Sequence, residues 1–137
     1  MRHVPLLVIP FVLYNAYYFL FPPSSEVPDP WLLKVTLVSG GVFELTVGAT
    51  IILVALALLA VEIVKATRVG SSSIVDHVLA TALFVVFLLE FILIDKAATD
   101  TFFILMAIAL VDLVCGFAVS IRSASRDVSV LTSNRGA

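Results

Sequence analysis

Asp112 is an ionisable residue in the middle of an apolar stretch, and its presence there needs an explanation. It lies in the stretch IALVDLVCGFAVS, residues 108 to 120, in which the other side chains are apolar or small. An aspartate at the centre of a membrane helix costs roughly 2.5 to 3.5 kcal/mol, so its side chain should be turned away from lipid. No Lys or Arg falls at a matching depth in the sequence. We therefore expect a protonated, hydrogen-bonded carboxyl group, or one that pairs with another chain.

Small residues share the predicted helix face of Asp112. They recur every three or four residues, a spacing that lets two membrane helices approach closely, and they are Ala109, Gly116 and Ser120. The sequence leaves two uses of Asp112 open. In the first, it holds or docks helices, and the polar groups at similar depth are Asn15, Tyr14 and Thr50. In the second, it handles protons or cations, with Glu90 of the third apolar run as a further carrier.

Two further acids lie near the ends of the second apolar run. These are Glu44 and Glu62, and we expect both to reach the headgroup layer. Glu62 has Lys65 one turn further along the predicted helix, a spacing typical of a surface ion pair.

No group of residues in the sequence supports catalysis. His77, beside Asp76, has neither a third metal ligand nor a nucleophile next to it, and the stretch LTVGAT lacks the Tyr-Gly that completes a potassium-selectivity sequence. Cys115 is the only cysteine, which excludes an internal disulfide and a cysteine-built metal site. The net charge is −2 without a run of basic residues, which argues against nucleic acid as a partner. We expect no enzyme, no cofactor and no metal.

Long apolar runs separated by short polar patches dominate the chain. Hydrophobic residues make up 61% of its 137 residues and charged residues 13%, which is about half the charged share of a soluble domain. Four runs approach the ~20 residues that cross a ~30 Å hydrocarbon layer: Val4–Phe21, Val42–Val64, Ile74–Ile94 and Phe102–Ile121. They predict an all-α integral membrane protein, a single domain over 1–137, with four transmembrane helices in an antiparallel bundle. The short connections should make spans two, three and four sequential neighbours.

Proline, glycine and aromatic residues predict the remaining local structure. Asp29-Pro30 is typical of an N-cap followed by the first helical residue, so we expect a short interfacial helix over 30–39 that ends at two glycines. Pro10 should kink the first span. Aromatic rings favour the headgroup level, so four of them should anchor the bundle in the interface: Tyr14, Tyr17, Tyr18 and Trp31.

Basic residues fall mainly on one side of the predicted membrane. That side carries Arg2, Lys65, Arg68, Arg122, Arg126 and Arg135, and the other carries Lys34 and Lys96. Both termini are then cytoplasmic, with a serine-rich tail over 122–137 that we expect to be partly disordered. The organisation resembles that of small four-span bacterial inner-membrane proteins, a class that implies no activity.

Together these features predict a non-catalytic accessory or scaffolding subunit of the inner membrane. It would contact lipids and dock through helix contacts onto a larger membrane complex or onto copies of itself. The alternative is a small oligomeric transporter or channel in which Asp112, and Glu90 with it, carries protons or cations.

Overall fold

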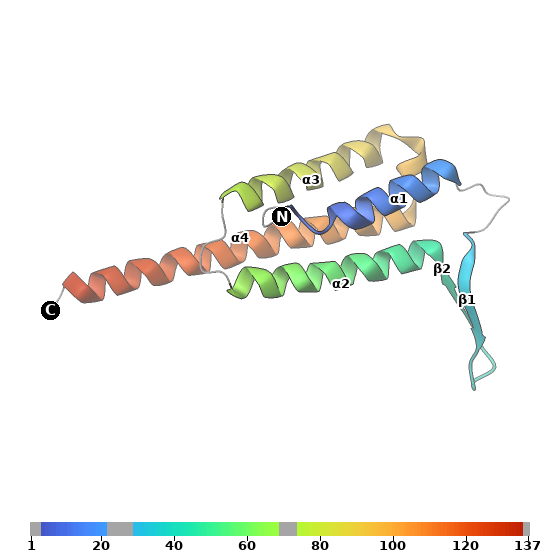
Figure 1. Ribbon diagram of the computed structural model, residues 1–137, viewed down its shortest axis with the longest axis horizontal. Coiled ribbons are helices and arrows are strands. Elements are labelled where there is room, and N and C mark those ends of the chain that lie inside the picture. Colours follow the sequence, from blue (N-terminus) through green and yellow to red (C-terminus); the bar gives the residue numbers. More distant parts are fainter. Residues whose placement is uncertain (1–3, 22–28, 69–73, 136–137) are drawn as a thin grey trace.

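The computed structural model describes residues 4–21, 29–68 and 74–135, and it is mostly helical (Figure 1). Its elements in chain order are α1 Val8–Leu20, β1 Trp31–Thr36, β2 Val42–Thr46, α2 Val47–Arg68, α3 Ile74–Leu93, the 3-10 helix η1 Asp95–Ala97, and α4 Asp100–Arg135. We call the end of the bundle that carries β1 and β2 the hairpin end, and the end from which α4 projects the tail end (Figure 1).

Three helices contain a segment long and apolar enough to cross a membrane. These segments are Val47–Ala66 in α2, Val75–Leu93 in α3 and Asp100–Val119 in α4. Helix α1 is apolar but has 13 residues, about 20 Å at 1.5 Å per residue, which is short of the hydrocarbon thickness. The structure thus has three helices that could cross a membrane and a shorter apolar helix beside them.

Helix α4 lies at the centre of the bundle. It packs against α2 on one side and α3 on the other, and α1 packs mainly on α2 (Figure 1). Within the parts of the chain that are described, α2 and α3 form no major interface with each other, so the prediction that these two spans are neighbours is wrong. The reason is that α4 buries residues toward both of them, since Phe102, Leu105 and Ile108 are at most 6% exposed.

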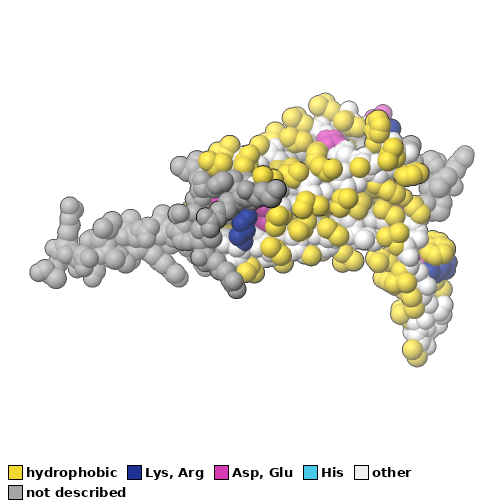
Figure 2. All heavy atoms as spheres, viewed as in Figure 1, with side chains coloured by type: hydrophobic (Ala, Val, Ile, Leu, Met, Phe, Trp, Pro, Cys, Tyr) yellow, Lys and Arg dark blue, Asp and Glu magenta, His cyan; other side chains and the backbone are white. Residues whose placement is uncertain are grey.

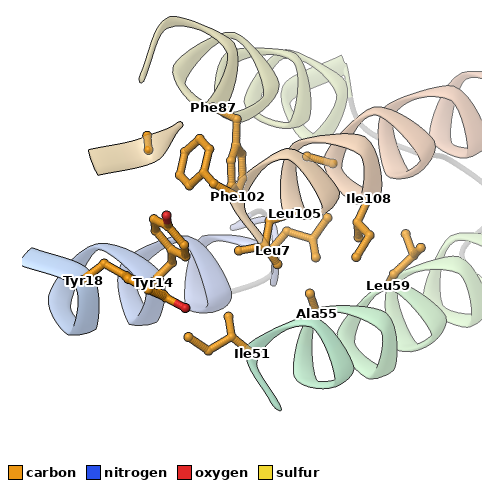
Figure 3. Close-up of a cluster of buried hydrophobic side chains, with 12 residues drawn as sticks. Leu7, Tyr14, Tyr18, Ile51, Ala55, Leu59, Phe87, Phe102, Leu105 and Ile108 are labelled. Carbon is orange, nitrogen blue, oxygen red and sulfur yellow. The ribbon is translucent and has the colours of Figure 1, made fainter. Parts of the chain in front are cut away.

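Aromatic rings from three helices interlock near the hairpin end (Figure 3). Phe102 of α4 lies 4.8 Å from Tyr14 of α1 and 5.3 Å from Phe87 of α3, measured between ring centroids. Phe11 of α1 meets the edge of Phe87 at 4.8 Å. Aromatic rings at these separations attract one another in addition to the free energy gained by burying them. These contacts hold α1 against α3 and α4.

The segment expected to be an interfacial helix over 30–39 is a β-hairpin, so that prediction is wrong. Trp31–Thr36 pairs antiparallel with Val42–Thr46, and the turn between them uses Gly40 at φ 83°, a conformation that favours glycine. Both strands are rich in β-branched, aromatic and leucine side chains, which suit a sheet. The second span consequently begins at Val47, five residues later than the apolar run at 42.

Two side chains cap the start of α2, whereas the sequence predicted a cap at the start of a helix over 30–39. The Asp29 Oδ2 atom accepts a hydrogen bond from the Gly48 N–H at 2.9 Å, and Thr46 Oγ1 accepts one from the Ala49 N–H at 3.2 Å. Both satisfy amides that the first turn of a helix leaves unpaired. Asp29 therefore stabilises α2, because the hairpin folds the chain back to it.

Two predictions about helix ends also differ from the structure. Pro10 does not kink a span, because α1 starts at Val8 and the proline sits in its first turn, where no intrahelical N–H bond is required. The tail, expected to be partly disordered, is helical as far as Arg135. At 36 residues α4 is about 54 Å long, so it extends well past the other helices (Figure 1).

Candidate functional site

Asp112 meets a second acid inside the bundle. Its carboxyl group hydrogen-bonds with the side chain of Glu62 on α2. The Glu62 Oε1 atom also accepts a hydrogen bond from the Leu6 N–H, at 2.7 Å. This Glu62–Asp112 pair ties α2, α4 and the segment before α1 together near the tail end.

The pair implies a shared proton. Two ionised carboxylates can only accept hydrogen bonds, so a bond between them requires one protonated partner. The Glu62 Oε2 atom is buried and, with both acids ionised, has no hydrogen-bond donor among the described residues. Lys65 lies close enough to act electrostatically on both acids, but its side chain is exposed. The contact therefore works as a hydrogen-bonded acid pair within the apolar part of the bundle.

The predicted partners of Asp112 bond elsewhere, so that expectation is wrong. The Asn15 amide donates to Glu90 Oε2 at 3.3 Å, the Tyr14 hydroxyl donates to the Lys96 carbonyl at 3.0 Å, and Thr50 donates to the Thr46 carbonyl of its own helix at 2.9 Å. Glu62, which was predicted to reach the headgroups, lies six residues before the end of α2 at Arg68. Helices α2 and α4 run in the same direction, and counted from their starts Glu62 and Asp112 lie within about one helical turn of the same level.

The small-residue face of α4 is covered by the chain's own helices where it is described. Ala109 is 3% exposed in the core. A Cβ placed on Gly116 would lie 3.2 Å from His77 Cε1 and 3.3 Å from its Nδ1, and the His77 ring stacks on Phe117 with centroids 5.1 Å apart. Gly116 therefore marks the close approach of α3 to α4. The side chain of Ser120, the last predicted member, lies outside the described part of the structure.

Glu90 lines a pocket of about 450 Å³ near the hairpin end, between α1 and the α3–η1 corner. Its carboxylate is held by Asn15, and the Lys96 Nζ lies 4.7 Å from the centre of the Phe19 ring on the same rim. The residues around this pocket come from α1 and the α3–η1 corner, and neither Glu62 nor Asp112 lines it. Glu90 and Asp112 thus occupy separate environments at different depths.

The four aromatic residues predicted as interfacial anchors divide into two groups. Tyr14 and Tyr18 are 1% and 5% exposed, which is not the surface position that an anchor needs. Tyr14 shares a 2.6 Å hydrogen bond with Thr99, and Tyr18 hydrogen-bonds with the side chains of Asp29 and Thr101. Two anchors remain at the surface of the chain: Tyr17, half-buried, and Trp31, exposed in the hairpin.

Fold and site together define a class, a small, mostly helical protein with three helices that could span a membrane, a β-hairpin at one end and a pair of acids inside the bundle. In the segments that the structure describes, no three His, Cys, Asp or Glu residues are grouped to hold a metal ion. No known protein family, curated protein or solved structure matches this chain.

Proposed function

We propose that the protein is a non-catalytic membrane subunit that docks through helix contacts onto a larger membrane complex or onto a second copy of itself. The observation that carries this proposal is the continuation of α4. The apolar run of α4 gives way to serine-rich sequence with charged residues from Arg122 onward, whereas the helix continues to Arg135, so about 24 Å of helix follows Val119. We call residues 120–135 the α4 arm.

The α4 arm has the spacing of a helix that packs on another helix. Four of its five apolar residues recur at intervals of three and four, the pattern of a helix–helix seam: Ile121, Ala124, Val128 and Leu131. The fifth, Val130, lies off this stripe. A single helix of this length is marginal in water, and packing on a partner normally stabilises it. The projecting α4 arm with its apolar stripe is therefore better explained by packing on a partner helix than by full exposure to water.

Two double variants of the arm test this proposal. Val128→Ser with Leu131→Ser removes half of the stripe, and Ser129→Ala with Ser133→Ala changes two positions off it. The measurements are the oligomeric mass of purified protein in lipid nanodiscs and the yield of any stoichiometric complex extracted from native membranes. We expect the first variant to lose the assembly and the second to keep it, both with the thermal stability of the parent. An assembly that survives loss of the stripe would refute docking through the arm.

The threading that accompanies this proposal has four crossings of an inner membrane. Helix α1, antiparallel to α2, would form the fourth, and both termini would be cytoplasmic because basic residues are concentrated at the tail end. The hairpin end then faces outward. The exposed apolar side chains that cover the bundle would face lipid and partner helices (Figure 2).

A second function, proton or cation handling, is favoured by the Glu62–Asp112 pair. A hydrogen-bonded acid pair inside a membrane bundle is a group that can take up and release a proton. Glu90 lines a pocket that neither member of the pair lines, so transport through both sites would require an oligomer or a movement of the helices.

Paired measurements on two variants separate the two functions. Asp112→Asn and Glu62→Gln each keep a hydrogen-bond donor and remove one titratable group, so we expect assembly and abundance close to those of the parent, because membrane hydrogen bonds average only ~0.6 kcal/mol. Proton flux in reconstituted vesicles is then measured on the same preparations. Unchanged flux excludes a transport role for the pair, whereas lost flux with intact assembly favours transport over scaffolding.

A further inference from the structure

The β-hairpin carries large apolar side chains that nothing in the described structure covers. Leu33 is 49% exposed, Val35 41% and Phe43 47%, and Val38 at the turn is fully exposed. A two-stranded hairpin is at best marginally stable in water by itself. The hairpin also touches the bundle only at its base, where Thr46 continues directly into α2 (Figure 1).

The pairing register sorts the hairpin into two unlike faces. Cross-strand partners share a face and neighbours along a strand alternate. Leu33 pairs with Leu45 and Val35 with Phe43, which gives one face made of apolar residues; we call these four residues the apolar face. Lys34 pairs with Glu44 and Thr36 with Val42 on the opposite face.

The opposite face carries the charges. Lys34 forms an ion pair with Glu44, and its Nζ lies 5.8 Å from the centre of the Trp31 ring. Trp31 pairs with Thr46 across an irregularity in the register, which puts the ring on the Lys34 side. We call this the charged face.

The position of the hairpin relative to the helices gives the two faces different surroundings. The hairpin runs across the end of α2 instead of continuing its axis (Figure 1). In Figure 2 the basic atoms of the hairpin lie on its side away from the helices, and hydrophobic atoms line the side toward which α2 extends. The membrane segment of α2 begins at Val47, the residue that follows the hairpin.

We propose that the hairpin lies flat on the membrane surface, with its apolar face on the lipid of the leaflet at the hairpin end and its charged face toward the headgroups and water. The apolar face continues the lipid-covered surface of α2 at the same depth, which favours lipid over a separate protein partner. Each strand also has one unpaired backbone edge, and such edges require the headgroup layer or water and cannot enter hydrocarbon. Trp31 and Lys34 are residue types typical of that layer.

Neighbouring residues of β1 provide a matched test. Cys115, the only cysteine, is first replaced by Ala, and Val35→Cys and Thr36→Cys are then made separately and spin-labelled in nanodiscs that hold one chain each. Oxygen concentrates in lipid, whereas a nickel chelate remains in water. We expect the ratio of oxygen to nickel accessibility to be several-fold higher at position 35 than at position 36.

Other occupants of the apolar face give different outcomes. Equal nickel accessibility at both positions would mean that the apolar face is in water, and shielding of position 35 from both reagents would mean that protein covers it. Either result overturns the proposal. As a check without labels, the fluorescence of Trp31, the only tryptophan, should be quenched more by lipids brominated near the headgroup than by lipids brominated at the chain ends. The reverse order would also overturn it.

Discussion

Gly48 is the position at which one added carbon atom should cost the most. A Cβ there would lie 2.6 Å from Thr101 Oγ1 and 2.9 Å from both Asp29 Oδ2 and the Tyr18 hydroxyl. These three groups hydrogen-bond around the start of α2, so they cannot all move away without losing bonds. The glycine therefore lets the hairpin, α1 and α4 meet at one point.

We predict that Gly48→Ala lowers the free energy of unfolding by about 1–3 kcal/mol, the usual cost of overpacking. The measurement is reversible unfolding in detergent or bicelles. Gly41→Ala is the matched control, because its Cβ would meet only Ser39 Oγ, at an ordinary 3.6 Å, and it should change stability by less than about 0.5 kcal/mol. Equal stability of both variants would show that the contacts at Gly48 relax freely.

Helix α3 is held in the bundle mainly by its packing on a single helix, α4. Its apolar segment is the least buried of the three spans, and its main partner is α4. The two helices approach at Gly116, where a Cβ on the glycine would lie 3.2 Å from the His77 ring. The α3–α4 contact is thus the interface in which added bulk should separate two elements.

Gly116→Leu should loosen α3 from α4, because a leucine side chain needs the volume that the His77 ring fills. We expect a lower unfolding midpoint and faster proteolysis between residues 69 and 73. Leu113→Met, one turn away, conserves volume and should cost less than about 1.5 kcal/mol. If Gly116→Leu is as stable as the parent, His77 turns aside without loss and the contact does not hold the helices together.

For the whole molecule, the proposed threading places both ends of the chain on one side of the membrane. A reporter that is active only in the cytoplasm should therefore work when fused after Ala137 or between Val69 and Ser72. The same reporter inserted in the 24–28 segment should be silent, because that segment precedes the hairpin. Activity at the 24–28 insertion would reverse or invalidate the threading.

Properties that belong to a residue or to one run of residues could be read from the sequence. The apolar runs predict membrane helices because crossing hydrocarbon needs a fixed length of apolar side chains, and three of them, with shifted ends, are long and apolar enough to be spans in the structure. The need of Asp112 for a polar partner follows from its own solvation cost. Both predictions depend on local chemistry.

Properties that depend on contacts between distant segments could not be read in this way. The strands at 31–36 and 42–46 have no helical neighbour to pack on, and they pair with each other once the turn at Gly40 is made. Asp29 was predicted to cap a helix over 30–39 that does not form. Its carboxylate instead accepts a hydrogen bond at the start of α2, because the hairpin folds the chain back on itself.

The partner of Asp112 was decided in the same way. Counted from residue 42, the second span would end at 64, with Glu62 at its boundary in the headgroup layer. The hairpin takes up residues 42–46, so α2 begins at Val47 and continues to Arg68, and Glu62 lies six residues before its end. At that depth the two helices, which run in the same direction on either side of the core, bring Glu62 and Asp112 together. The sequence alone determined that a buried acid needs a polar partner. The position of α2, whose start the hairpin sets, determined that this partner is Glu62.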